Sequence, residues 1–252
     1  MAGSLPDAYR DTLTHFDTSS PLVALTIDDG LSRGGPPTSM TRAVLQLLKK
    51  YEATATFFVC TDYLEGQRED VSLLLQDGHE LGNHMQADLP FHYHRLEKEE
   101  FQRLLVAANV ALEELEQTVH KDGQETNLRQ RWFRAPQGLL TTEMKQALDN
   151  QMMKHALGDC YCDDWKFAQD MDSISNQDKC RAVMKEVAQI MLSQADKGSI
   201  AIFHMPERGF RQGLLYALEY FLQGIQERDW KCCTLSALHE AAKYKNVQIA
   251  QQ

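Results

Sequence analysis

The sequence predicts an α/β fold in which helices cover a parallel sheet, and three observations support this. Seven short apolar segments alternate with longer amphipathic ones, which is the pattern of repeated βαβ units. The 252 residues fit the size of a single α/β barrel. Hydrophobic residues at 43% and charged residues at 25% are typical of a globular protein. We expect one domain at 21–252, preceded by an approach segment at 1–20, and the pattern leaves open whether the sheet closes.

The first half of the chain contains three predicted strands. The run VALTIDDG places the first at 23–30, and the second and third are expected at 53–60 and 79–83. After a Gly/Pro/Ser loop, Thr38 or Ser39 is expected to cap a helix that ends at Tyr51, and a short helix is expected at 70–77. The longest helix should begin at Glu97, because apolar residues recur there every three or four positions for about five turns.

The second half contains four more predicted strands, at 131–136, 152–158, 199–204 and 230–235. Helices are expected from Thr141 or Thr142 and at 176–195, 214–227 and 236–244, whereas 159–172 should be a long loop containing Trp165. Strands that alternate with helices in this way form parallel sheets with right-handed crossovers.

Two adjacent carboxylates, Asp28 and Asp29, end the first predicted strand. Neighbouring residues of a strand point in opposite directions, so the two can share a pocket only if the chain bends there, and Gly30 permits a bend. Two acids in one place can divide their roles, one binding a metal ion and the other serving as a base. The alternative is an ordinary acidic turn after a strand.

Polar residues also follow other predicted strands. In α/β barrels the loops after the strands carry the chemistry, so these residues should converge on one rim. They are His84 after the third strand, Arg134 after the fourth, Asp163, Asp164 and Trp165 after the fifth, and His204 at the end of the sixth.

The segment NHMQADLPFHYH suggests a metal site. His84 and Asp88 are four residues apart, so one helical turn would place both on the same face. Together with Asp29 they would supply one imidazole and two carboxylates and leave positions open for water and substrate, as in catalytic metal sites. The alternative is a solvated histidine-rich loop, and this is how we interpret His92 and His94.

Four motifs carry a resemblance to a known family. TIDDG (26–30), GHELGNH (78–84), FRAPQG (133–138) and IAIFH (200–204), in this order, resemble the motifs of the polysaccharide deacetylases, the NodB-homology family of metal-dependent carbohydrate esterases. The resemblance covers about residues 21–242. It implies an irregular (β/α)7 barrel and hydrolysis of the acetamide of an N-acetylated sugar.

The resemblance also implies roles for single residues. Asp28 would be the base, Arg134 would orient it, His204 would protonate the leaving amine, and the backbone N–H of Gln137 would help to hold the oxyanion. One divalent cation, with zinc expected and cobalt or nickel as alternatives, would be held by Asp29, His84 and Asp88. Substrate would meet a pocket walled by Trp165 and Ile202, with Asp164 as a further substrate-binding residue.

Three positions depart from the family pattern. Asp88 stands where a second histidine is usual, which makes the metal site more anionic. Gln137 replaces an aromatic residue and Met205 replaces an aspartate, and both changes bear on substrate preference. The leading hypothesis is an N-acetylglucosamine deacetylase. The alternatives are a hydrolase of another small amide or O-acetyl ester, and a catalytically silent carbohydrate-binding module.

Composition excludes some partners. A net charge of -10 without a basic cluster argues against nucleic acid, and no apolar run is long enough to span a bilayer. The N-terminus lacks the pattern of a secretory signal, so the chain as written is expected to be cytoplasmic. We interpret the six cysteines, which form no CxxC pair, as mostly free thiols; a chain whose leader had been removed would be secreted and could contain disulfides.

Overall fold

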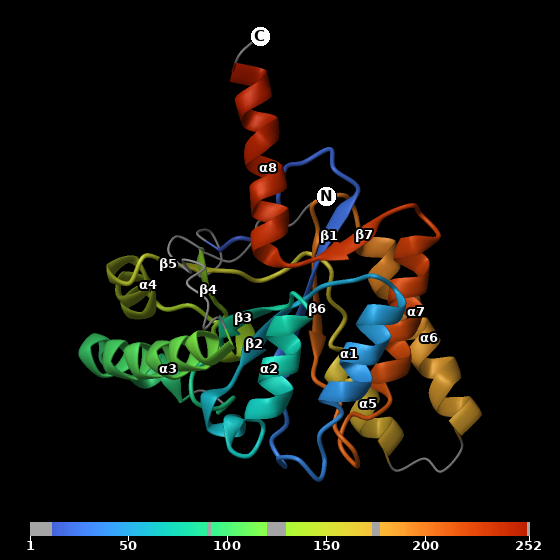
Figure 1. Cartoon of the computed structure of the whole chain (residues 1–252), viewed down its shortest axis with the longest axis horizontal. Helices are drawn as coiled ribbons and strands as arrows, with labels where there is room; N and C mark the ends of the chain where they lie inside the picture. Colours follow the sequence, from blue (N-terminus) through green and yellow to red (C-terminus); the bar gives the residue numbers. More distant parts are fainter. Residues whose placement is uncertain (1–11, 90–91, 120–129, 173–176, 251–252) are drawn as a thin grey trace.

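The protein is described from a computed structural model, which defines residues 12–89, 92–119, 130–172 and 177–250 (Figure 1). The strands of the sheet are β1 (Leu22–Gly30), β2 (Thr56–Val59), β3 (Glu80–Asn83), β4 (Arg131–Phe133), β5 (Met153–His155), β6 (Ile200–His204) and β7 (Lys231–Cys233). The helices are α1 (Thr41–Lys50), α2 (Arg68–Gln76), α3 (Lys98–Val119), α4 (Thr142–Asn150), α5 (Asp164–Asp172), α6 (Gln177–Gln194), α7 (Leu214–Gln226) and α8 (Leu235–Ala250).

The strands are parallel and follow the order β5-β4-β3-β2-β1-β6, with β7 paired to the beginning of β1. The segment after β5 closes the sheet, because Cys160 bridges to Ala201 of β6. The N–H of Cys160 donates to the carbonyl of Ile200 at 3.3 Å, and the N–H of Ile202 donates to the carbonyl of Cys160 at 3.0 Å. The predicted irregular barrel is therefore confirmed.

Alternation along β1 decides which residues line the barrel. Val23, Leu25 and Ile27 belong to the outer core, where they pack with residues of α1 and α7. The residues between them point inward, because successive side chains of a strand face opposite sides. Ala24 accordingly joins the core inside the barrel, and Asp28 follows four residues later at the rim.

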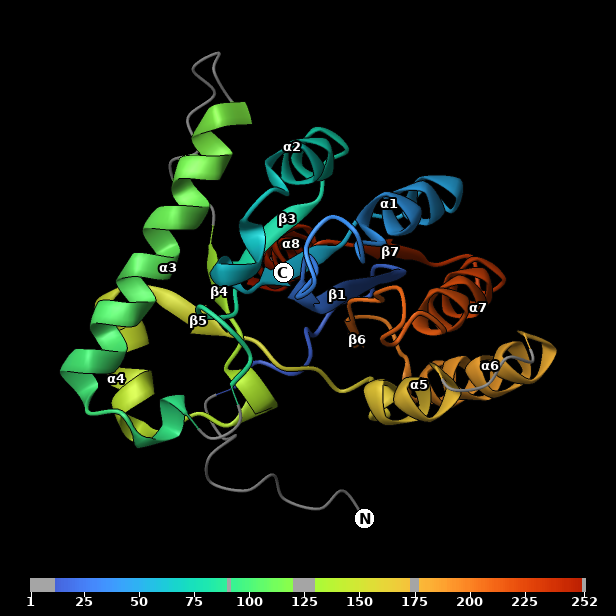
Figure 2. The same ribbon diagram turned by 90° about the horizontal axis from the view of Figure 1, so that it is seen from below.

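The end of the barrel where the strands begin is filled and capped. Phe58 of β2 and Trp132 of β4 pack there against Leu235 and Leu238 of α8. Figure 2 views the barrel from the opposite end, so that α8 lies behind the strands and the other helices surround them. The opposite end, where the strands finish, carries the polar side chains.

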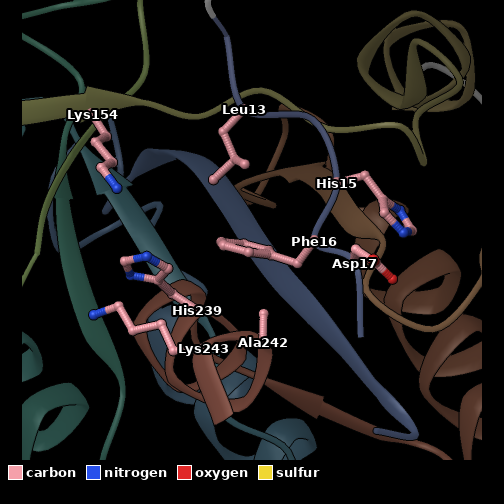
Figure 3. Close-up of a pocket in the computed structure, with 8 residues that line it drawn as sticks. All are labelled: Leu13, His15, Phe16, Asp17, Lys154, His239, Ala242 and Lys243. Carbon is pink, nitrogen blue, oxygen red and sulfur yellow. The ribbon is translucent and has the colours of Figure 1, made fainter. Parts of the chain in front are cut away.

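A cavity of about 300 Å³ lies at the capped end, beside α8 (Figure 3). The described part of the approach segment borders it, since Phe16 is buried and its N–H donates to the carbonyl of Gly198 at 2.9 Å. The lining residues include no predicted site residue; they are Leu13, His15, Phe16, Asp17, Lys154, His239, Ala242 and Lys243. Residues 1–11 of the predicted approach segment lie outside the described residues.

Two local predictions were wrong. Residues 159–172 are not one long loop, because α5 begins at Asp164. The sequence did not predict this helix because its apolar periodicity is weak. Among its described residues, Ala168 is the one fully buried apolar side chain. Neither Thr38 nor Ser39 caps α1, which starts after Met40 without a side-chain cap. Thr141 does cap α4, where its side chain accepts a hydrogen bond from the N–H of Met144 at 3.2 Å.

Within the described ranges, no helix is both long and apolar enough to cross a membrane.

Candidate active site

Asp28 and Asp29 reach the same region because β1 contains a bulge. Ile27 pairs with Phe57 and Gly30 with Val59, so β1 has one residue more than β2 in this interval. Asp29 has a φ of 58°, the left-handed conformation that aspartate tolerates better than most residues. The predicted bend is therefore present, but it lies at Asp29, whereas the sequence had suggested Gly30.

Arg134 holds Asp28 from inside the barrel. Its Nη1 donates to Asp28 Oδ1 at 2.6 Å and to Thr26 Oγ1 at 2.7 Å. Its Nε donates to the carbonyl of Ala156 at 2.8 Å, and its guanidinium lies 4.2 Å above the ring of Phe58. Arg134 is buried, so these contacts fix it rigidly and leave Asp28 Oδ2 without a hydrogen bond to the described residues.

His204 lies opposite Asp28 in the β1–β6 register. Paired residues of neighbouring strands lie roughly 4.8 Å apart and face the same side, so both side chains border one space. Asp164 accepts a hydrogen bond from the backbone N–H of His204 at 2.9 Å, and its other oxygen lies 2.7 Å from His204 Nδ1. The sequence predicted Asp164 as a substrate-binding residue, whereas in the structure both its oxygens contact His204.

The environment of His204 favours its charged form. Burial alone would lower the pKa of the imidazole, but the charge and hydrogen bond of Asp164, together with the charges of Asp29 and Asp28, raise it to about 8. Nδ1 faces Asp164, so Nε2 is the atom that can deliver a proton.

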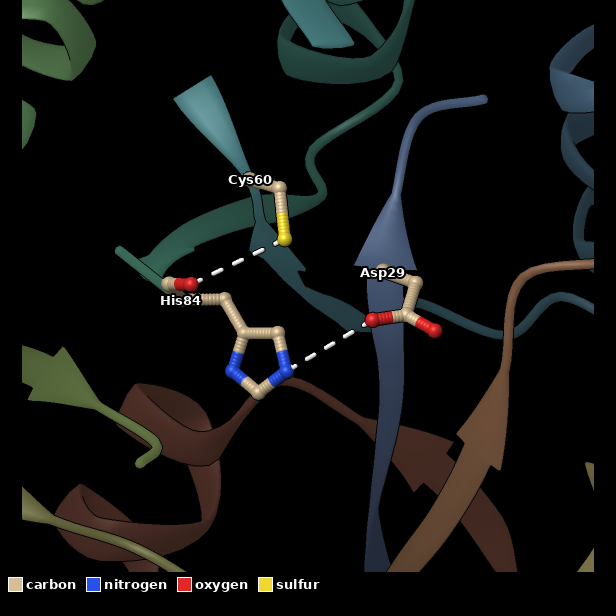
Figure 4. Close-up of side chains that lie close together, drawn as sticks. All are labelled: Asp29, Cys60 and His84. Carbon is tan, nitrogen blue, oxygen red and sulfur yellow. Dashed lines mark hydrogen bonds and ion pairs between the residues drawn. The ribbon is translucent and has the colours of Figure 1, made fainter. Parts of the chain in front are cut away.

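Asp29 and His84 form a pair suited to a cation (Figure 4). His84 Nδ1 lies 2.8 Å from the carbonyl oxygen of Arg134, which can only accept, so Nδ1 carries a proton and Nε2 is the ring nitrogen left to bind a cation. This Nε2 lies 3.7 Å from Asp29 Oδ1, a buried oxygen without a hydrogen-bond donor. Such a separation suits two ligands of one ion, and backbone orientation of the histidine is usual at metal sites.

Cys60 is the third member of this cluster. Ligand atoms of Asp29, Cys60 and His84 all lie within 4.8 Å of one another. The Cys60 thiol donates to the carbonyl of His84 at 3.6 Å, as Figure 4 shows. Burial, together with the charges of Asp29 and Asp88, raises the pKa of this thiol well above its usual value.

Asp88, the third predicted metal ligand, is not in that group of three. Its Oδ2 accepts from Arg33 at 3.3 Å, and the same Arg33 nitrogen donates to Asp29 Oδ2 at 2.6 Å. Asp88 Oδ1 is buried, and no group of the described residues donates a hydrogen bond to it. Asp88 thus lies beside the pair of Asp29 and His84, separated from Asp29 by a guanidinium.

Two arginines converge on Asp29. Arg211 donates to its Oδ2 at 2.9 Å, in addition to the contact from Arg33. Burial would raise the pKa of Asp29, but the positive charges of His204, Arg211 and Arg33 lower it well below its usual range. Asp29 is therefore a carboxylate, with Oδ2 engaged and Oδ1 facing His84.

The matches to known proteins agree with this geometry. The model of the family described as polysaccharide deacetylase matches residues 15–156, more than half of the chain. The chain belongs to the polysaccharide deacetylase family. The matched region contains Asp28, Asp29, His84 and Arg134, whereas His204 lies beyond it.

Individual relatives of this deacetylase-family chain are more distant. Peptidoglycan-N-acetylmuramic acid deacetylase PdaC of Bacillus subtilis is 25% identical over 232 residues, which are 92% of this chain and 42% of that protein. Its solved structure has a TM-score of 0.69 at 23% identity and covers 92% of this chain and 96% of that one. The chain thus spans less than half the length of this curated relative.

Two further relatives differ in what their names report. A chitooligosaccharide deacetylase of Sinorhizobium fredii is 34% identical over 76 residues, 30% of this chain and 33% of that protein. A CE4 family pseudoenzyme from Bacillus anthracis has a TM-score of 0.67 at 20% identity, covering 89% of this chain and 67% of that one. The fold therefore occurs both in deacetylases and in a pseudoenzyme. The fold alone does not distinguish the two, so the distinction depends on the site residues.

The sequence also predicted site roles for Gln137, Ile202 and Trp165, and a solvated loop for His94. Gln137 has a φ of 60° in the turn that follows β4, and Ile202 is buried in β6. Trp165 is half-buried in the first turn of α5, where its Nε1 donates to the hydroxyl of Tyr161 at 3.1 Å. The ring of His94 contacts the carbonyl of Leu139 at 3.1 Å and does not join the cluster of three.

Sequence reasoning missed Cys60, Arg33 and Arg211. The placement rule would have predicted Cys60 as a site residue, because Cys60 ends the second predicted strand and His84 directly follows the third. Arg33 and Arg211 lie in loops after β1 and β6. Their contacts with Asp29 depend on loop conformation, for which residue spacing gives no signal.

Proposed function

We propose that the protein is a metal-dependent hydrolase that removes the N-acetyl group from N-acetylglucosamine units of a chitin-like oligomer, polysaccharide or glycoconjugate and releases acetate. One observation carries the proposal: Asp28 and His204 are register neighbours at the rim of the barrel, and Asp29 and His84 lie beside them with a free oxygen and a free nitrogen. Groups suited to serve as a base, an acid and two cation ligands thus border one space.

The residues fit a divalent cation. Asp29 Oδ1 lacks a donor among the described residues, and the backbone contact of His84 uses Nδ1, so Oδ1 and Nε2 can bind a metal ion without losing an existing hydrogen bond. A divalent cation bound there would lower the pKa of a water molecule and polarise the amide carbonyl. Zinc suits the nitrogen and oxygen donors, with cobalt or nickel as alternatives. Asp88 remains a predicted additional ligand.

In this proposal Asp28 would act as the base. Arg134 engages Oδ1 and orients the carboxylate, while Oδ2 would take a proton from the attacking water. Arg134 cannot move easily, because buried carbonyls of the segment after β5 also bind it. This arrangement positions the base without consuming both of its oxygens.

In this proposal His204 would act as the acid. Asp164 keeps the imidazolium charged and directs Nε2 away from itself, so a proton at Nε2 can pass to the leaving amine. A pKa of about 8 means that most of the imidazole is protonated near neutral pH. Donors such as the backbone N–H of Gln137 would stabilise the oxyanion that forms between these events.

An N-acetylated amino sugar is the substrate class that the relatives support. The names of the related proteins specify N-acetylmuramic acid in one case and chitooligosaccharides in the other. Both polymers carry the acetamide that the proposed chemistry attacks, so the reaction is the same and the flanking sugars differ.

The test is release of acetate by protein loaded with zinc, cobalt or nickel, compared with chelator-treated protein. N-Acetylglucosamine oligomers, peptidoglycan and an O-acetylated xylan should be supplied in parallel. We expect metal-dependent acetate release from at least one of the N-acetylated polymers. Release from the O-acetylated polymer alone would replace the proposal with an esterase.

Two variants make the test decisive. Asp28→Asn should keep the metal and lose activity, whereas His84→Ala should lose both. If metal-loaded wild-type protein binds the oligomers but releases no acetate from any polymer, the chain is a carbohydrate-binding module and the proposal is wrong.

A further inference from the structure

Cys60 occupies a position in the barrel from which its side chain faces the site. Thr56 and Phe58 of β2 both point inward: the Thr56 hydroxyl donates to Glu80 at 2.7 Å, and Phe58 belongs to the core inside the barrel. Cys60 comes two residues after Phe58, so the period of two places its sulfur on the inner side at the rim. In the adjacent strand β3, Gly82 pairs with Phe58, and His84 follows two residues later at the rim.

Two independent observations indicate that this sulfur faces a ligand site. Asp29 is 1% exposed, and its Oδ1 has no donor although it points toward the cluster. The ligand atoms of Asp29, Cys60 and His84 lie within 4.8 Å of one another. Around one zinc ion, sulfur at about 2.3 Å and nitrogen at about 2.0 Å would be roughly 3.6 Å apart, so an adjustment of about an ångström suffices.

We propose that the sulfur of Cys60 is a ligand of the divalent cation bound by Asp29 and His84. Coordination replaces the S–H bond of Cys60 with a bond from sulfur to the metal, and the proton passes to solvent. The only hydrogen bond lost is the long one from the thiol to the carbonyl of His84, at 3.6 Å. This inference rests on the proposed function only in assuming that a cation binds there.

A sulfur ligand changes which cation the site prefers. Thiolate favours zinc, cobalt and cadmium over magnesium and calcium, which take oxygen ligands. It also supplies a negative charge next to the guanidinium of Arg33, which lies between Asp29 and Asp88. Asp29, Cys60 and His84 would thus complete a three-ligand set without requiring Arg33 to move, and Asp88 would not be essential for binding.

The experiment is the absorption spectrum of the 252-residue chain titrated with Co²⁺ after any bound metal has been removed. A cobalt–thiolate bond gives a near-ultraviolet charge-transfer band that oxygen and nitrogen ligands do not give. We expect this band at one equivalent of Co²⁺ in the wild type and in Asp88→Asn, and its loss in Cys60→Ser. His84→Ala should also abolish it, which ties the sulfur to this site.

Cys162→Ser is the matched control, because Cys162 also donates from its thiol to a backbone carbonyl, that of Val187 at 3.8 Å. It should keep the band. Calorimetry with Zn²⁺ should give at least about tenfold weaker binding for Cys60→Ala, equivalent to about 1.4 kcal/mol. Near-ultraviolet circular dichroism of each metal-free variant shows whether it is folded.

One result would overturn the inference: one equivalent of Co²⁺ bound without a sulfur band, and unchanged Zn²⁺ affinity in folded Cys60→Ala. Neither measurement uses activity. A protein that shows the band but releases no acetate would contradict the proposed function and leave the sulfur ligand intact. A protein that releases acetate but shows no band would support the proposed function and contradict the sulfur ligand.

Discussion

Replacing Asp164 by asparagine tests the proposed acid directly. Asparagine keeps the shape of the side chain but has one acceptor oxygen. It can therefore keep only one of the two hydrogen bonds from His204, whose N–H and Nδ1 lie 2.9 Å and 2.7 Å from the two carboxylate oxygens. The substitution also removes the negative charge. Because that charge raises the pKa of His204, the variant should lose protonated imidazole at a lower pH than the wild type.

The expected effect follows from the size of the shift. The pKa of His204 is about 8 in the metal-free fold and 6.5 without perturbation. If the variant returns to 6.5, the protonated fraction falls by about 1.3-fold at pH 6, about fourfold at pH 7 and about sixteenfold at pH 8. Burial without the compensating charge would enlarge these factors, since it lowers the pKa of an imidazole further.

The assay is the pH dependence of kcat/KM for acetate release by the metal-loaded protein. The alkaline limb should move to lower pH in Asp164→Asn, with a small deficit at pH 6 and a large one at pH 8. Asp178→Asn, which removes an exposed charge at the start of α6, should leave the limb in place. A deficit in Asp164→Asn of equal size at every pH would refute the reasoning, because loss of structure alone does not move a titration.

Three further predictions concern the base, the barrel interior and stability. Asp28→Asn should lower kcat by at least about a hundredfold while the metal content measured by elemental analysis stays near one, since general-base catalysis contributes ~10²- to 10⁴-fold; loss of metal would instead make Asp28 a ligand. Gly82→Ala should lower the free energy of unfolding in urea by about 1–3 kcal/mol, because an added Cβ would lie 2.7 Å from the ring of Phe58; an unchanged midpoint would contradict this. The raised pKa of His204 stabilises the metal-free fold below pH 6.5, and this contribution should disappear as pH rises through about 8. The loss should be at most about 2 kcal/mol and absent in Asp164→Asn, as measured by urea unfolding between pH 6 and pH 9.

The sequence was sufficient to predict which strands bear the site, because the period of a strand needs only local information. Asp28, Arg134 and His204 each end a strand on its inward side, and the structure brings them together at one rim. The same rule applied to the second strand would have identified Cys60. The sequence did not predict contacts that depend on long-range packing. One example is Arg211, whose loop after β6 reaches Asp29 across 182 positions of sequence.

The helix that begins at Asp164 is a second feature that the sequence did not predict. Its apolar periodicity is weak, so the sequence predicted a loop there. In the structure the carboxylate at the first position of the helix is buried against His204. What orders this turn is a polar contact between segments 40 residues apart. Pattern analysis detects burial of apolar faces and not pairing of buried polar groups, which is why the role of Asp164 emerged only from the structure.

The bulge in β1 explains how one strand can supply two different functions. A regular strand would send Asp29 out toward the helices, on the side of Ile27 and away from Asp28. The left-handed conformation of Asp29 turns its carboxylate back to the rim, and Arg33 and Arg211 hold Oδ2 there while Oδ1 faces His84. Asp28 meanwhile continues the inward series and meets Arg134. Adjacent residues thus have separate partners, so that one can bind a cation while the other stays free to accept a proton.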